Sequence, residues 1–247
     1  MTGIFLLSFF LSCNKKVKTI NTENIVENTS KKTQIKFKLA LVQMLVEEGN
    51  RSNNLTHAKE MIRDAAENGT DLVLLPELMD LGWAHPSALT SATTIPQGET
   101  CQMLIDAAKS NKVYVCSGLA EKDGDKVYNS AVLISSKGKV LMHHRKINIL
   151  DIAQQYYSVG HSLHVCETKF GTIGLLICAD AFAVQRVLSQ ALGYMEADII
   201  ISPTSWALPT DWDTSKLPTA REIWYNHYVP IAKKLVCILQ VVVMLGG

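Results

Sequence analysis

The chain has 247 residues, of which 47% are hydrophobic and 19% are charged, and its formal net charge at pH 7 is +1. This composition is typical of one sizeable globular domain with a large core. A nearly neutral chain without clustered Lys and Arg lacks the basic surface that nucleic-acid binding requires, so we expect no nucleic-acid partner and a small, neutral or mildly polar ligand instead.

The first thirteen residues differ in character from the rest of the chain. Residues 4–11 read IFLLSFFL, and Ser12 and Cys13 follow directly. This apolar run is too short to span a bilayer but has the length of a secretory signal. A small residue followed by cysteine resembles a bacterial lipoprotein signal, in which Cys13 carries lipid and becomes the mature N-terminus, although no basic residue precedes Ile4. We therefore expect a lipoprotein-type signal at 1–13, and the alternative is a disordered apolar leader.

Residues 14–34 are polar and rich in Lys, Asn and Thr, which predicts a flexible tether between a membrane anchor and a domain at 35–247. On this interpretation the protein is lipid-anchored in the bacterial cell envelope on the periplasmic side, and without the signal it is cytoplasmic. None of the six cysteines belongs to a CxxC pair. His143 and His144 point to opposite faces of a predicted strand. We therefore expect no metal and no cofactor, and at least one free thiol.

From residue 35 onward, predicted strands and helices alternate. The first half predicts these elements in order: a strand at 36–45, a helix at 54–68, a buried strand at 71–75, a helix at 99–110, and hairpin strands at 113–120, 127–135 and 139–144. The second half predicts a strand at 172–178, a helix at 184–195, a strand at 198–202, and a helix at 220–235 with a kink or break at Pro230. On the helix at 184–195, we expect the following inner face: Val184, Val187, Leu188, Ala191 and Leu192.

Two segments of the chain resemble each other. TDLVLLPE (70–77) and ADIIISPT (197–204) each follow an amphipathic helix and place a proline five residues after an aspartate. This quasi-repeat suggests two related α/β halves. Strand pairs together with strand–helix alternation predict a layered α/β fold, with helices covering mixed sheets. Ligands in such folds tend to bind beyond the carboxyl ends of the strands.

Three polar residues lie at or just past predicted strand ends: Glu77, Lys146 and Cys178. Taken singly, each has a simpler interpretation as a solvated carboxylate, a basic strand end or a buried thiol. Together the three residues can supply a base, a positive charge and a nucleophile. The turn after a strand places Cys178 at a helix N-terminus, which favours the thiolate, and Glu77 can take the thiol proton and later activate water. Lys146 and the N–H of Ala179 can stabilise an oxyanion, so the set fits acyl transfer through a thioester and then hydrolysis.

Three segments, in chain order, resemble the motifs that characterise the nitrilase superfamily, the carbon–nitrogen hydrolases: LLPEL (74–78), HRKIN (144–148) and LLICAD (175–180). Three more extend the resemblance over about residues 36–236: ALVQM (40–44), YNSAVLIS (128–135) and SPTSW (202–206). The resemblance implies an αββα sandwich of two mixed sheets covered by helices.

The resemblance also implies roles for individual residues. Glu77 is the implied general base, Lys146 the implied oxyanion stabiliser and Cys178 the implied nucleophile. Trp206 resembles an aromatic residue that lines the substrate pocket, with core packing as the alternative, and Ala179 contributes its N–H to the substrate site. The implied reaction converts a small amide, a nitrile or a carbamoyl compound into a carboxylic acid with release of ammonia, and the implied assembly is a homodimer.

Two features depart from the family pattern. Many members carry a second glutamate between the lysine and the cysteine, whereas residues 146–160 contain none, and Ile149 and Gln154 occupy the candidate positions. Gln154 can keep a hydrogen bond but not the charge. The apolar end LVCILQVVVMLGG (235–247) stands where the family has further strands, which suggests a C-terminally short domain.

These departures keep two other functions open. The first is a catalytically degenerate, envelope-anchored binding module of the same fold. The second is acyl transfer to an amine instead of water. Acyl transfer is disfavoured because envelope acyltransferases that share this domain resemble proteins with several membrane spans, which this sequence lacks.

Overall fold

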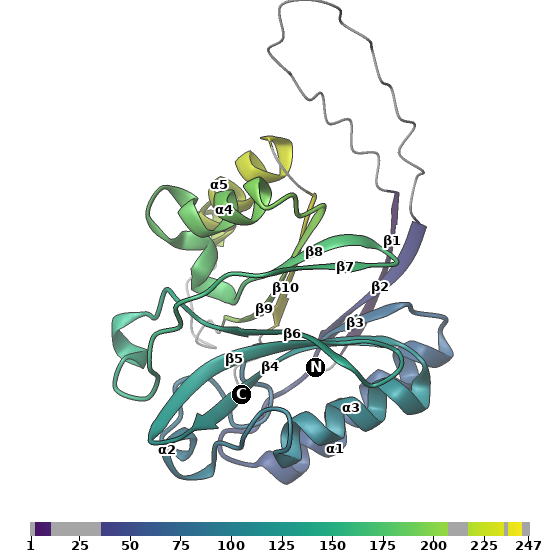
Figure 1. Cartoon of the computed structure of the whole chain (residues 1–247), viewed down its shortest axis with the longest axis vertical. Coiled ribbons are helices and arrows are strands. Elements are labelled where there is room, and N and C mark those ends of the chain that lie inside the picture. Colours follow the sequence, from purple (N-terminus) through teal and green to yellow (C-terminus); the bar gives the residue numbers. More distant parts are fainter. Residues whose placement is uncertain (1–2, 11–35, 207–216, 235–236, 244–247) are drawn as a thin grey trace, which may run out of the picture.

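The computed structural model describes residues 3–10, 36–206, 217–234 and 237–243. Two sheets lie face to face with helices on both outer sides, as Figure 1 shows. The predicted αββα sandwich of two mixed sheets is thereby confirmed.

The larger sheet has six strands in the spatial order β1-β2-β3-β4-β5-β6. Their bounds are β1 (Gly3–Phe10), β2 (Lys36–Gln43), β3 (Leu72–Leu74), β4 (Tyr114–Asp123), β5 (Lys126–Ile134) and β6 (Val140–Arg145). β2, β3 and β4 run parallel, and the other pairs are antiparallel. The helices of this half are α1 (Arg51–Glu67), α2 (Ser87–Ser91) and α3 (Glu99–Asn111), of which α1 and α3 cover the outer face (Figure 1).

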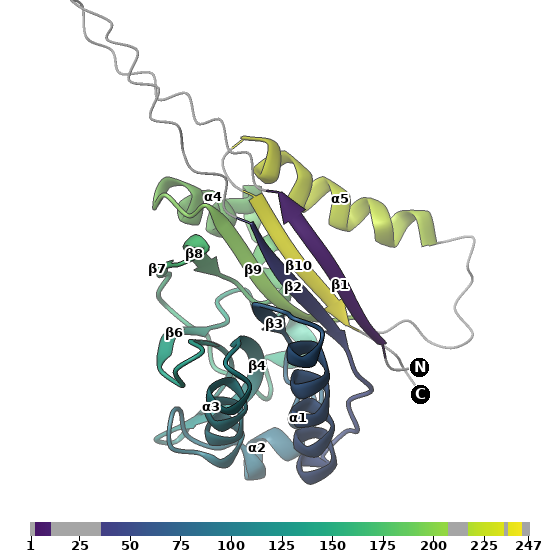
Figure 2. The same ribbon diagram turned by 90° about the vertical axis from the view of Figure 1, so that its right-hand side faces the viewer.

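The smaller sheet has four strands in the spatial order β10-β9-β8-β7. Their bounds are β7 (Val165–Thr168), β8 (Gly171–Leu175), β9 (Ile199–Ser205) and β10 (Cys237–Val243). The helices α4 (Val187–Tyr194) and α5 (Leu217–Lys234) belong to this half. In the side view of Figure 2, α4 and α5 lie above the sheets, and α1 and α3 lie below them.

The alternation of side chains along the strands explains these layers. In β2, Leu39 packs between the two sheets, where it joins Leu175 and Ile201 of the smaller sheet. Its neighbour Ala40 and the alternate residue Val42 pack instead with α1 and α3. Because both faces of the strand are covered, the strand is apolar along most of its length, as is typical of buried parallel strands.

Most predicted elements are confirmed, but the predicted inner face of α4 is partly wrong. Val184 is 81% exposed and Val187 is 54% exposed, whereas Leu192 is buried as expected. The reason is a left-handed backbone at Arg186, with a φ of 58°, which delays the start of the regular helix. A helix that begins later turns a different face toward the sheet.

Other differences concern elements that the sequence pattern did not indicate. The short helix α2 and the strand β7 are additions to the predicted set, and β10 pairs in parallel with β9. The helix α5 continues through Pro230, so of the predicted kink or break at this residue the break is wrong, and the kink stays a prediction.

The N-terminal apolar stretch forms β1, which pairs antiparallel with β2. Cys13 and the tether at 14–34 lie outside the described residues, so the signal, the lipid anchor and the envelope location remain predictions from the sequence. In the part of the chain that the structure describes, none of the helices combines the length and apolar character needed to cross a membrane.

Candidate active site

Glu77 follows β3 by three residues, and its backbone is held against β4. The N–H of Gly118 donates to the carbonyl of Pro76 at 2.9 Å, and the N–H of Met79 donates to the carbonyl of Gly118 at 3.2 Å. A Cβ at Gly118 would lie 2.5 Å from the Cα of Glu77, so only glycine fits there. Pairing beyond the end of β3 therefore fixes the Glu77 carboxylate in a fully buried position.

Lys146 follows β6 directly and is held by two backbone hydrogen bonds. Its N–H donates to the carbonyl of Asn129, and its carbonyl accepts from the N–H of Gly160, both at 2.8 Å. The Lys146 Nζ lies 2.6 Å from Oε1 of Glu77, and both side chains are buried. Burial acts to lower the pKa of Lys146, but the charge of Glu77 and its neighbours outweighs burial and raises it. The ammonium is therefore the stable form.

The Glu77 carboxylate binds groups from both sheets. Asn129 on β5 donates from Nδ2 to Oε1 at 2.7 Å. The backbone N–H of Ser205, at the end of β9, donates to Oε2 at 3.0 Å. With Lys146, three donors hold the carboxylate, so its orientation is set by the larger and the smaller sheet together.

Cys178 begins the short 3-10 helix η2 (Cys178–Phe182), three residues after the end of β8. Its φ of 43° lies in the left-handed region, which is strained for a residue with a side chain. The backbone N–H donates to Oγ of Ser202 at 3.0 Å, and the thiol Sγ lies 4.0 Å from the carbonyl of Ser205. The end of β9 thus holds this strained turn in place.

The sequence-based expectation of a lowered pKa for the Cys178 thiol is wrong. Burial raises its pKa well above the ordinary value, the Glu77 carboxylate raises it further, and the charge of Lys146 only partly opposes them. The expected helix N-terminus is a 3-10 helix of five residues, too short to supply a large dipole. The resting thiol is therefore protonated and needs a base.

The structure brings Glu77, Lys146 and Cys178 together from three separate strand ends. Glu77 contacts Lys146 directly, and its negative charge acts on the thiol of Cys178, whose pKa it raises. A buried acid, a buried ammonium and a buried thiol therefore share one site. Such a set can move a proton from sulfur to carboxylate and hold a positive charge beside a developing oxyanion.

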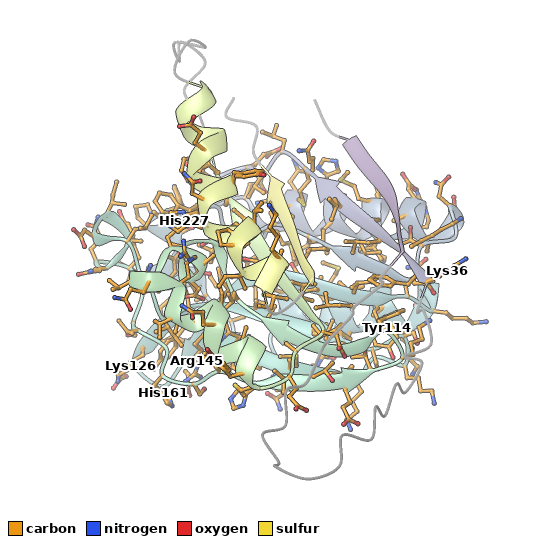
Figure 3. The ribbon with its side chains drawn as sticks, turned by 90° about the horizontal axis from the view of Figure 1, so that it is seen from above. Lys36, Tyr114, Lys126, Arg145, His161 and His227 are labelled. Carbon is orange, nitrogen blue, oxygen red and sulfur yellow. The ribbon has the colours of Figure 1, made fainter. Side chains whose placement is uncertain are left out.

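Arg145, which precedes Lys146, is anchored in a buried polar network. Its guanidinium donates to Glu121 from Nε at 2.9 Å and stacks over the ring of Tyr128 at 4.0 Å. Burial acts to raise the pKa of Glu121, but hydrogen bonds from His143, Arg145 and a serine lower it to about 2. In Figure 3, Arg145 lies at the opposite end of the molecule from Tyr114. This network fixes the strand end from which Lys146 projects.

Ala179 and Trp206 both lie beside Cys178. Ala179 is the next residue in the chain and is fully buried. Trp206 follows Ser205 and packs edge-on against Phe182, with ring centroids 6.4 Å apart. The backbone thus places both residues next to the thiol, and their contact with a substrate stays a prediction.

Gln154 does not take the place of the second glutamate. Its side chain is exposed, and Nε2 donates to the carboxylate of Asp151 at 3.2 Å. The amide that bonds to Glu77 comes instead from Asn129 on β5. Ile149 is buried in an apolar cluster.

Sequence reasoning assigned no role to Asn129, Ser202, Ser205 or Asp180. Each lies in a segment that carries the family resemblance, but only the three-dimensional neighbours of these polar residues reveal what they bind. Three of them, Asn129, Ser202 and Asp180, interrupt or end apolar stretches, where an unpaired polar group is costly, and this was an available signal.

The two adjacent histidines bind different carboxylates. His143 contacts Glu121 at 2.9 Å, and His144 contacts Asp180 at 2.8 Å. They point to opposite faces of β6, as predicted. Within the described ranges, no group of three or more His, Cys, Asp or Glu side chains is arranged to hold a metal ion.

The fold and the site together define a class of αββα proteins in which Glu, Lys and Cys meet at the strand ends. The family model described as carbon-nitrogen hydrolase matches residues 38–232, and the chain belongs to this family. The family and the enzyme class expected from the sequence motifs are thereby confirmed.

Individual relatives agree with this assignment. A nitrilase of Pyrococcus abyssi is 34% identical over 176 residues, which are 70% of this chain and 66% of the relative. The omega-amidase NIT2 of Mus musculus is 31% identical over 209 residues, which are 79% of this chain and 74% of the relative. The chain therefore spans about two thirds to three quarters of the length of these relatives.

Solved structures share the fold. An amidase from Nesterenkonia, of the nitrilase superfamily, superposes with a TM-score of 0.71 at 18% identity, covering 83% of this chain and 76% of that chain. The Saccharomyces cerevisiae protein Nit3 superposes with a TM-score of 0.70 at 23% identity, covering 83% and 75%. At these identities the likeness concerns the fold alone.

Proposed function

We propose that the protein hydrolyses the carbon–nitrogen bond of a small, non-peptide amide to a carboxylic acid and ammonia. The observation that carries this proposal is the buried 2.6 Å contact between Lys146 Nζ and Glu77 Oε1 beside the Cys178 thiol. Relatives named nitrilase and omega-amidase support an amide or nitrile as the substrate class.

In the first half of the reaction, the Cys178 thiol transfers its proton to Glu77, and the sulfur attacks the amide carbon. The carbonyl becomes an oxyanion, which the Lys146 ammonium and the N–H of Ala179 stabilise. Glu77 then returns the proton to the amide nitrogen, the carbon–nitrogen bond breaks, and ammonia leaves. A thioester on Cys178 remains.

In the second half, Glu77 takes a proton from water, and the resulting hydroxide attacks the thioester carbon. The same two donors stabilise the second oxyanion. The carbon–sulfur bond breaks, the carboxylic acid leaves, and the proton on Glu77 returns to the Cys178 sulfur. One water is consumed for each amide, and the site returns to its resting state.

The complete Glu77–Lys146 pair favours this reaction over a degenerate binding module. Burying a carboxylate and an ammonium costs several kcal/mol per ion before their attraction is counted, by general estimates. A binding module that turns nothing over has no evident need for such a pair next to a thiol.

The experiment is a screen for ammonia release with small amides, nitriles and ureido acids. We expect at least one amide to be hydrolysed and to slow the labelling of Cys178 by 2-chloroacetamide, because both compounds enter the same site. Mass spectrometry of the labelled protein identifies the modified cysteine. Absence of ammonia release with every compound, together with labelling that no amide slows, would contradict the proposal.

Gly118→Ala tests whether the position of Glu77 matters for turnover. The new methyl group would press on the Glu77 backbone at 2.5 Å, and we expect kcat to fall about 100-fold, as a displacement near 1 Å can cause. Steady-state kinetics measures this loss. The matched control is Gly124→Asn in the β4–β5 turn, where nothing lies within 4 Å of a Cβ and asparagine tolerates the φ of 56°. Equal kcat values for both variants would refute the argument.

A further inference from the structure

Asp180 lies two residues after Cys178, and its carboxylate is fully buried. Its Oδ1 accepts hydrogen bonds from two consecutive backbone N–H groups, those of Ile147 and Asn148, at 3.0 and 2.8 Å. These two residues directly follow Lys146 in the chain. One oxygen of Asp180 therefore holds the segment that carries the lysine.

The other oxygen of Asp180 holds groups on two elements. Its Oδ2 accepts from the backbone N–H of Ile177 at 3.0 Å and contacts Nε2 of His144 at 2.8 Å. Ile177 directly precedes Cys178, whereas His144 lies on β6, two residues before Lys146. The carboxylate thus has four partners, one next to the cysteine and three around the lysine.

A second hydrogen bond joins the same two segments in the opposite direction. The side-chain Nδ2 of Asn148 donates to the carbonyl of Ala179 at 2.6 Å. The residue after the cysteine and the residue two positions after the lysine are therefore linked as well. The lysine segment extends from the larger sheet and the cysteine turn from the smaller one, so these bonds connect the two halves of the sandwich.

Apolar packing between the sheets does not orient the lysine segment and the cysteine turn in the way that these hydrogen bonds do. The hydrophobic effect is proportional to buried area and has no direction, so it holds the two layers together without fixing the orientation of an individual polar group. Hydrogen bonds constrain both distance and angle, and a reacting constellation must be held to within about 0.5 Å. The buried Asp180 carboxylate with its four partners supplies such a directional link between the lysine segment and the cysteine turn, in addition to the Ser205–Glu77 bond.

We propose that Asp180 is a positioning residue that sets the distance between the Lys146 ammonium and the Cys178 thiol. This inference rests on the proposed function, because the distance matters only if the two groups act on one substrate. Asp180 acts through the backbone on either side of the two residues. Its negative charge also favours the ammonium form of Lys146, as the charge of Glu77 does.

Asp180→Asn tests the proposal while preserving the size of the side chain. The amide keeps one acceptor oxygen but turns an NH₂ group toward a former donor and removes the charge. We expect kcat to fall about 100-fold with KM within about threefold, because the groups are displaced and not removed. We also expect the alkaline limb of the kcat/KM profile to move to lower pH, because Lys146 loses a stabilising charge. A purely structural role would lower the melting temperature and leave that limb in place.

The matched control is Asp198→Asn. Asp198 precedes β9, and its carboxylate also accepts a backbone N–H, that of Thr172, at 3.0 Å. Asp198 lies at the start of β9, whereas the thiol lies near Ser205, at the end of this strand. We expect this variant to lose stability but to keep the wild-type kcat and alkaline limb.

Wild-type kcat and an unmoved alkaline limb in folded Asp180→Asn would overturn the inference. If that variant does not fold, Asn148→Ala removes only the bond to Ala179, and we expect about a tenfold loss of kcat. Wild-type kinetics in Asn148→Ala would then overturn the inference.

If the wild-type protein hydrolyses none of the amides, the proposed function fails separately. Alkylation of Cys178 by iodoacetamide, followed against pH, then tests the inference without a substrate. We expect Cys178 to react more slowly at a given pH in Asn148→Ala than in the wild type, because Lys146 is held less closely and this variant leaves the charge of Asp180 in place. Identical alkylation profiles would overturn the inference.

Discussion

Cys178→Ala is expected to reduce kcat for amide hydrolysis by about 10⁴-fold or more, as the loss of a nucleophile does in other hydrolases. Without sulfur there is no thioester, and the Glu77–Lys146 pair has no nucleophile to activate. Cys178 is only 4% exposed, but the substitution removes a single sulfur atom. We therefore expect the protein to remain folded. Ammonia release and circular dichroism measure the two quantities.

Cys116→Ala is the matched control. Cys116 is also buried and packs in the same apolar cluster between the sheets as Cys178. We expect it to lower stability by about 1 kcal/mol and to leave kcat within about twofold. If Cys178→Ala hydrolyses an amide as fast as the wild type, Cys178 is not the nucleophile.

Lys146→Met is expected to lower both activity and stability. Loss of an oxyanion donor typically reduces kcat about 10²- to 10³-fold. In addition, the Glu77 carboxylate is left buried without its cation, which typically costs about 3–5 kcal/mol of folding free energy. Urea unfolding measures the second effect. A single Lys146→Met variant as stable as the wild type would show that the ion pair is not held as the 2.6 Å contact indicates.

The double variant Glu77→Gln/Lys146→Met separates the two effects. With both charges removed, the penalty for an unpaired buried carboxylate disappears, so we expect most of the lost stability to return. Activity should not return, because the base and the oxyanion donor are both absent. A double variant that remains as unstable as the single one would mean that the loss comes from packing around Lys146 and not from charge.

The hydrophobic periodicity of the sequence predicted the strands and helices well where burial determines which residues are apolar. The strand at 36–45 and the helices at 54–68 and 99–110 appear within a few residues of their predicted bounds. The inner face of α4 was mistaken because two left-handed residues, Gln185 and Arg186, shift the helix start. Non-glycine residues in this conformation leave no trace in a hydrophobic pattern. Four-residue β7 is too short for its alternation to be distinguished from a loop.

The three central side chains could be predicted because each one lies at or just past a predicted strand end, but their supporting partners could not. Asn129 meets Glu77 through the pairing of β3, β4 and β5 in the larger sheet, and Ser205 meets it through the packing of one sheet on the other. The order of residues along the chain does not encode either arrangement directly. The pKa direction of the Cys178 thiol was mistaken for a related reason. Burial raises that pKa more than local charges and dipoles lower it, and burial is a property of the assembled sandwich.

The hydrogen bond from Ser205 to Glu77 joins residues 128 positions apart, and the Lys146–Glu77 contact joins residues 69 positions apart. Contacts of such wide separation form late, because long loops must close before they are made. Glu77 and Lys146 precede Cys178 in the chain, but the smaller sheet, which carries the cysteine turn, must dock on the larger one before the three groups meet. Base catalysis at this sulfur therefore requires the two sheets to be docked, and we expect a chain whose halves have not docked to carry an ordinary thiol without amidase activity.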